Sequence, residues 1–163
     1  RIRNAGALME PIDLSPAIDA ITAKYPDAYR SPEALAELIA LWGGAGCNDV
    51  GVMQSRDRVR IDLHGNPRWR AEIRLVQAPN AYWAMATSYD TPTSGGGSAP
   101  SVWNRTAYHN RDTALDAGIA ALVQRFEQMR DASGVSETNS RYAARMAEQL
   151  RQFRRQATQL TLF

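Results

Sequence analysis

Cysteine, histidine and long apolar runs are scarce in this sequence, and each shortage excludes a class of site. Cys47 is the only cysteine, so the chain can form no internal disulfide, and a lone thiol fits a reducing compartment. The only histidines, His64 and His109, are far apart. These three side chains cannot supply the four ligands of a structural zinc site. We therefore expect no metal, no cofactor and a cytoplasmic location.

No apolar run approaches the ~20 residues that a membrane-spanning helix needs. No secretory signal is visible either, so we expect no membrane association. The 163 residues, 44% of them hydrophobic, suffice for one domain of ordinary size or a small domain with an appendage. The sequence begins with Arg1 rather than Met, which leaves open a segment before it.

Lysine is nearly absent as well. Lys24 is the only lysine among 19 basic residues, and the formal net charge is +2. A bias toward arginine accompanies phosphate recognition, but it also accompanies a GC-rich genome, and we favour the genomic explanation for the composition as a whole. The net charge alone therefore identifies no partner.

Two helices are expected near the N-terminus, after an arm over residues 1–14. Ser15-Pro16 is a typical helix start, and that helix should run to about Tyr25. Ser31-Pro32-Glu33 repeats the signal, with an acid in the first turn. Apolar residues then recur three and four apart and predict one buried stripe: Leu35, Leu38, Ile39 and Trp42. Gly43-Gly44 should end this second helix.

Residues 58–89 predict an antiparallel meander. Apolar and polar residues alternate over 58–63 and 69–75 with a turn over 64–67 between them, and a third strand should run from Tyr82 to Tyr89. The side chains expected to face the core are Val59, Ile61, Leu63, Trp69, Ala71, Ile73 and Leu75. The opposite face then carries Arg58, Arg60, Arg70 and Arg74, offset by Asp62 and Glu72.

The second half of the sequence predicts a flexible connection and two more helices. The Gly95–Gly97 run precedes no helix directly, so it matches neither a P-loop nor a dinucleotide-binding loop. Asn110 or Asp112 should cap a long helix that lies across the sheet and buries Leu115, Ile119, Leu122, Phe126 and Met129. A polar hinge over 133–140 then precedes a basic helix over 141–156, with an apolar stripe of Tyr142, Met146, Leu150 and Phe153.

These elements predict an α+β fold: a meander of three or four strands packed by a long helix, with N-terminal helices and a C-terminal basic helix. We expect a globular α+β domain over residues 1–132. Residues 133–163 should form a hinge, the basic amphipathic helix and a tail.

Catalysis has little support. His64 falls in a predicted turn and His109 precedes a helix cap. No neighbouring feature predicts a lowered pKa for the Cys47 thiol. We therefore predict a protein that is not an enzyme, without catalytic residues.

Nucleic-acid contact is better supported. The four sheet arginines, with Tyr82 near them, would form a phosphate-contacting surface with an aromatic platform. Alternatively, these arginines only keep the exposed face soluble and pair with Asp62 and Glu72. Both interpretations also apply to the basic cluster at the end of the last helix, which comprises Arg151, Arg154 and Arg155.

The last five residues, Gln159-Leu160-Thr161-Leu162-Phe163, resemble the bacterial sliding-clamp-binding motif, whose common form is Gln-Leu-(Ser or Asp)-Leu-Phe. Thr161 departs from that form but keeps a hydroxyl. The resemblance implies that Gln159 hydrogen-bonds at the edge of a groove on the clamp. Leu160 and the Leu162-Phe163 pair would fill apolar pockets there. The rival interpretation is a tail that packs on its own domain.

The order of strands, glycine-rich loop, tryptophan and long helix is also similar to accessory domains of plasmid and mobile-element proteins, including parts of ParB-like and DNA-modification proteins. We therefore expect an accessory protein of DNA replication, repair or mobile-element maintenance, tethered to the sliding clamp and in contact with DNA. Two alternatives stay open. One is an accessory domain of a longer methyltransferase or nuclease, whose catalytic residues precede Arg1. The other is a regulatory module whose tail completes its own core.

Overall fold

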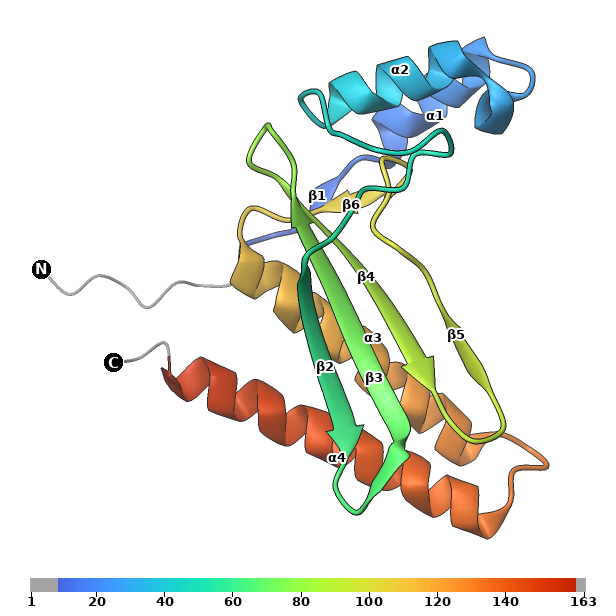
Figure 1. The fold of residues 1–163 in the computed structure, drawn as a ribbon, viewed down its shortest axis with the longest axis vertical. Helices are drawn as coiled ribbons and strands as arrows, with labels where there is room; N and C mark the ends of the chain where they lie inside the picture. Colours follow the sequence, from blue (N-terminus) through green and yellow to red (C-terminus); the bar gives the residue numbers. More distant parts are fainter. Residues whose placement is uncertain (1–8, 161–163) are drawn as a thin grey trace, which may run out of the picture.

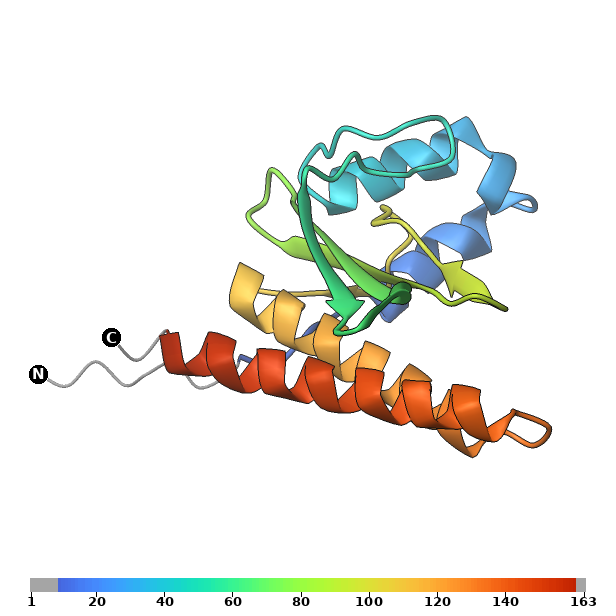
Figure 2. The ribbon, with the colours of Figure 1, turned by 60° about the horizontal axis from the view of Figure 1, so that its bottom comes forward.

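A four-stranded antiparallel sheet forms the centre of the structure (Figure 1). The computed structural model describes residues 9–160, apart from the side chains of Thr158 and Leu160. The strands lie in the order β2 (Asp57–Leu63), β3 (Asn66–Gln77), β4 (Trp83–Asp90) and β5 (Gly95–Gly97). Helices α3 (Arg111–Asp131) and α4 (Glu137–Leu160) lie side by side beneath one face of the sheet (Figure 2). The predicted α+β fold and its meander are thus confirmed.

A smaller layer covers one end of the sheet. It contains β1 (Ile12–Asp13), α1 (Ser15–Lys24), the 3-10 helix η1 (Ala28–Arg30) and α2 (Pro32–Leu41), and it is joined by β6 (Thr106–Ala107) (Figure 1). β1 pairs antiparallel with β6, so the expectation of an arm over residues 1–14 is wrong for its last residues. A strand of two residues shows no alternation, and its partner is distant in sequence, so no local pattern indicates this pair.

The starts of α1 and α2 differ in how they are capped. At α2, Ser31 Oγ accepts a hydrogen bond from Ala34 N (3.1 Å), as the sequence predicts. At α1 the expected Ser15 cap is wrong: Ser15 is already helical, and its N–H donates to Asp13 Oδ1 (2.9 Å). That bond lowers the pKa of the Asp13 carboxyl. α2 ends as predicted, where Gly44 at φ +93° donates to Ile39 O (2.9 Å).

The two faces of the meander are assigned correctly. Of the seven predicted core residues, Val59 is partly buried and the other six are buried. α3 packs closely on this face because it carries Gly118, where a Cβ would lie 2.8 Å from Ile73 Cγ2. Asn110 caps α3 by accepting from Thr113 N (2.8 Å), which confirms one of the two predicted caps. The buried α3 stripe includes Leu115, Ile119, Leu122 and Phe126.

β2 is an outer strand, and α4 covers part of its free edge. Gln149 Nε2 donates to Asp62 O (2.7 Å), and Gln149 Oε1 accepts from His64 N (2.9 Å). Arg145 also donates to His64 O (2.8 Å). These side chains bond to one backbone group of β2 and two of the turn that follows it.

α4 is longer than the predicted helix over residues 141–156. Ser136 caps it by accepting from Asn139 N (3.1 Å), so the second half of the expected hinge over 133–140 is helix. A polar first turn looks like a loop in sequence, although Ser followed by Glu137 also fits a helix start. α4 shares the core beneath the sheet through Ala143, Met146, Ala147 and Leu150. The two alanines let α3 and α4 approach closely.

The glycine run is an ordered strand, not the flexible connection expected from the sequence. β5 pairs with β4, with Gly95 opposite Asp90 and Gly97 opposite Ser88. A Cβ at Gly97, where φ is +155°, would lie 2.3 Å from Ser88 Cβ. Glycine is therefore required for this close approach.

The described residues form two cores, and the N-terminal and C-terminal parts of the sequence differ in net charge. The sheet–helix core lies between the sheet and α3–α4, and the N-terminal core is formed chiefly by α1, α2 and the segments that connect to them. Residues 9–56 carry seven acids and three bases, a net charge of −4. Residues 57–160 carry ten acids and fourteen bases, a net charge of +4.

Candidate functional site

The predicted arginine face exists as a flat array on the side of the sheet away from α3. The strand register sets seven charged side chains in three rows: Arg58 beside Arg74, Arg60 beside Glu72, and Asp62 beside Arg70 with Asp90 on its other side. Two of the arginines pair along their own strands. Arg60 Nε lies 3.0 Å from Asp62 Oδ1, and Arg74 Nε lies 2.6 Å from Glu72 Oε1. The face therefore has four positive and three negative charges.

Arg58 and Arg70 form no ion pair with any described residue. Arg58 is exposed, and it lies opposite Arg74, a like charge. Arg70 is half-buried, and its Nε is buried without a hydrogen-bond partner in the part of the chain that the structure describes. Within the array, these two guanidinium groups can therefore contact an added anion without breaking an ion pair.

Tyr82 is not part of this array. It precedes β4 and packs against the N-terminal core, with its ring edge-on to His109 at 6.2 Å between centroids. The buried Ala84 lies between Tyr82 and the nearest charged row, in which the buried Ala86 stands opposite Arg74. The expected aromatic platform beside the arginines is therefore wrong.

The predicted α4 arginines are all engaged with acidic residues. Arg154 forms a bidentate pair with Asp116 of α3, and its second bond measures 2.7 Å. Arg151 pairs with Glu127 of α3 and lies 3.5 Å from Glu148. Arg155 lies 3.0 Å from Glu148 on its own helix. Two of the three arginines thus join α4 to α3.

A groove of about 710 Å³ runs between α3 and the last turns of α4. Arg151, Arg155 and Gln159 line it at intervals of four residues, because that spacing sets side chains on one face of a helix. Gln159, the first residue of the clamp-like motif, is exposed in the last turn of α4. The Leu160 side chain and residues 161–163, which complete the predicted clamp-binding set, lie outside the described part of the chain.

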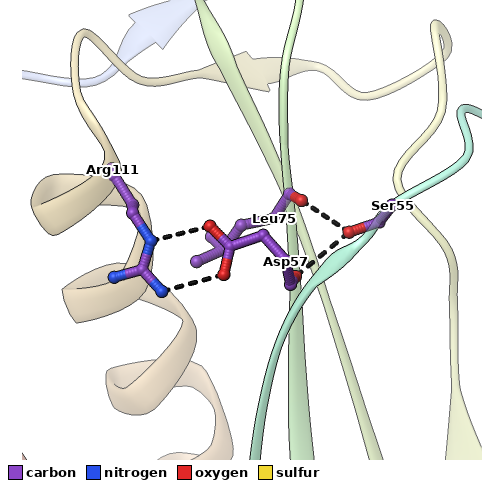
Figure 3. A network of polar contacts seen from close by, with 4 residues as sticks. All are labelled: Ser55, Asp57, Leu75 and Arg111. Carbon is purple, nitrogen blue, oxygen red and sulfur yellow. Dashed lines mark hydrogen bonds and ion pairs between the residues drawn. The ribbon is translucent and has the colours of Figure 1, made fainter.

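A polar network of buried and partly buried residues joins β2 to α3, and the sequence did not indicate it. Figure 3 shows Asp57 between Arg111 and Ser55. Both Asp57 carboxylate oxygens accept from Arg111, at 2.7 and 2.8 Å. The buried Ser55 hydroxyl lies within donating distance of Asp57 O (3.1 Å) and of Leu75 O. The hydrogen bond from Arg111 lowers the pKa of the Asp57 carboxyl.

The remaining polar candidates stay apart. No group of three or more His, Cys, Asp or Glu residues within the described residues could hold a metal ion. Burial and the nearby Asp49 raise the pKa of the Cys47 thiol, which makes it a poorer nucleophile. No helix in the same part of the chain is long and apolar enough to cross a membrane.

Comparison with known proteins adds no family: no protein-family model, no curated protein and no solved structure matches the chain. Its function therefore has to be argued from the two arginine-bearing surfaces, the clamp-like motif and the rest of the described surface.

Proposed function

We propose that this chain is a non-enzymatic, cytoplasmic accessory protein of bacterial DNA metabolism that binds the sliding clamp through Gln159–Phe163. The observation that carries the proposal is the order Gln159-Leu160-Thr161-Leu162-Phe163, which resembles the clamp-binding motif at four of five positions. The motif supplies a polar residue for a groove edge and three large apolar side chains for pockets. Such anchors contribute most of the binding energy of short-peptide interfaces.

The geometry of α4 supports this use of the motif. α4 is packed on the sheet–helix core and joined to α3 through Arg151 and Arg154, so the motif begins in the last turn of a firmly attached helix. Gln159 is exposed, as a residue that reaches a partner must be. A peptide that becomes ordered on binding loses affinity to chain entropy, so we expect micromolar binding.

Replacing Leu162 and Phe163 by alanine tests the tether. Each buried apolar side chain is worth ~1.5–3 kcal/mol, so clamp affinity should fall at least about a hundredfold, measured by surface plasmon resonance on immobilised clamp. Thr161→Asp is the matched control, because Asp occurs in the common form of the motif, and it should keep the affinity.

The melting temperature separates the tether from its rival. A docking tail contributes nothing to the free protein, so the double alanine variant should melt with the parent. Absence of clamp binding together with a large drop in melting temperature would mean that the tail completes the core of its own domain.

DNA contact through the sheet face is a second candidate, favoured by the two arginines without ion pairs. Replacing Arg58 and Arg70 together by Gln should weaken binding to duplex DNA and lower its salt-dependence slope by roughly two units, about one per lost phosphate contact. The matched control replaces Arg60 and Arg74, which are already neutralised by Asp62 and Glu72. Unchanged DNA binding after both replacements, or no DNA binding by the parent, would assign this face to solubility alone.

A further inference from the structure

The N-terminal layer exposes an aromatic cluster that neither the clamp-like motif nor the arginine surfaces use. Tyr29 is 72% exposed and Val50 is 64% exposed, and Met9 is the only other exposed large apolar residue that the structure describes. The Tyr29 ring stacks on Trp103, with centroids 4.5 Å apart and planes inclined by 26°. Together with Pro32 they line a shallow pocket of about 190 Å³, called here the Tyr29–Trp103 pocket.

The backbone around this pocket is held in place. Asn48 Oδ1 accepts hydrogen bonds from Val50 N (3.1 Å) and Val52 N (2.9 Å), which fixes the turn that points Val50 outward. Gly51, at φ +88°, allows Trp103 to lie against the turn, since a Cβ there would be 3.0 Å from the Trp103 ring. Val102 N also donates to Gly51 O (2.9 Å). The apolar side chains are therefore presented by a rigid frame, which lowers the entropy cost of binding.

The size and lining of the pocket indicate the kind of ligand. Pockets that enclose small molecules usually measure about 300–1,000 Å³, so this one is too small for a cofactor or nucleotide. Its volume suits one side chain or ring of an extended segment. Stacked aromatic residues beside Pro32 and Leu35 match the surfaces that bind proline-rich segments in the polyproline II conformation.

Charge selects between a peptide and a nucleic acid. Residues 9–56 carry a net charge of −4, and Arg105, which pairs with Asp19 at 2.8 Å, reduces this only to −3. The lining holds one exposed charge of each sign, Asp49 and Arg30, and the acid Asp27 lies beside Arg30, with 3.9 Å between Nε and Oδ2. A phosphate backbone would be repelled here, and a basic segment attracted. We propose that the Tyr29–Trp103 pocket docks an extended, arginine-flanked, proline-containing segment of a partner protein.

The proposal is tested with three fluorescein-labelled probes and the full chain, by fluorescence anisotropy. The probes are the peptide Arg-Pro-Pro-Leu-Pro-Arg, its counterpart with Glu in place of both Arg, and a single-stranded oligothymidylate. We expect saturable binding of the arginine peptide and at least about tenfold weaker binding of the other two. No binding of the arginine peptide up to about 1 mM would overturn the proposal, and so would preferential binding of the oligothymidylate that depends on Tyr29, because it would identify a nucleic-acid site.

Two exposed substitutions locate the binding. Tyr29→Ala and Val50→Ser should each weaken the arginine peptide about tenfold, the effect of removing one anchor contact. Tyr29→Phe, which keeps the stacked ring, should restore most of the affinity. Because both positions are mostly exposed, the variants should fold, and far-ultraviolet circular dichroism checks this. Peptide binding that Tyr29→Ala and Val50→Ser both retain unchanged would contradict the assignment to this pocket. Clamp binding should be the same in every variant, so failure here is distinguishable from failure of the tether.

Discussion

The sheet face and the C-terminal half of α4 both carry arginines beside acids, but the acids have different origins. On the sheet, Arg60 and Arg74 pair with residues two positions away on their own strands. On α4, Arg151 and Arg154 pair with residues of α3. Pairs of arginine with an acid therefore lie along single strands of an open surface in one region and join two helices in the other.

This difference shows why arginine content alone is a poor guide to nucleic-acid binding. An arginine that pairs across elements is held in place by the fold, and moving it to a phosphate would break a tertiary contact. Arg58 and Arg70 lack such pairs, so they can bind an anion without that loss. Substitutions should separate the two regions by their effects on stability.

The largest effect is expected on the buried side of the strand that carries Arg74. Ile73→Asp would set an unpaired carboxylate in the sheet–helix core, where Ile73 is fully buried, and should cost several kcal/mol, of the order of the stability of a whole domain. Arg58→Asp is the control, since it adds the same group to the open face opposite Arg74 and should change stability by no more than about 0.5 kcal/mol. Chemical denaturation measures both. Similar losses would mean that the sheet faces are assigned wrongly.

A smaller effect should distinguish the two arginine surfaces directly. Arg154→Gln removes the bidentate partner of the partly buried Asp116 and should cost about 1 kcal/mol. Arg60→Gln removes a pair within one exposed strand and should leave the denaturation midpoint where it is. A midpoint shift as large for Arg60→Gln as for Arg154→Gln would erase the proposed contrast.

The smallest effect concerns pH. The bond from Arg111 lowers the folded-state pKa of Asp57, so this carboxylate contributes stability above its unfolded-state pKa of about 3.9 and loses it as the pH falls through the folded value. Because both groups are about one third exposed, we expect less than about 1 kcal/mol. The melting-temperature difference between the parent and Asp57→Asn should therefore shrink between about pH 5 and pH 2. A difference that stays constant over this range would show that the pair is not coupled to protonation.

The sequence predicted the elements whose signals are local. Period-two alternation around Ile61 and Ile73 identified both the strands and their buried face, and Ser31 and Asn110 marked helix starts.

The sequence did not predict β1, the pairing of β5 or the Asp57–Arg111 bridge, because each depends on partners distant in the chain. Composition suggested a flexible glycine run, whereas the pairing of β5 with β4 leaves no room for a Cβ at Gly97, beside Ser88. Tyr82 does not lie beside the sheet arginines as expected, because strand order alone does not show against which core a residue at the end of a strand packs. Tyr29 and Trp103 were missed since their stacking joins residues far apart in sequence.

The attachment of α4 has a mechanical consequence. A pull on the end of α4 along the helix axis would load its links together: the pairs with Asp116 and Glu127, and the bonds from Gln149 and Arg145 to the edge of β2. A pull away from the surface would instead peel them one at a time, starting at Arg154. The protein should therefore resist tension along α4 much better than tension across it. A partner that holds the chain beyond Gln159 would apply tension along the axis of α4 when the tether lies in line with the helix.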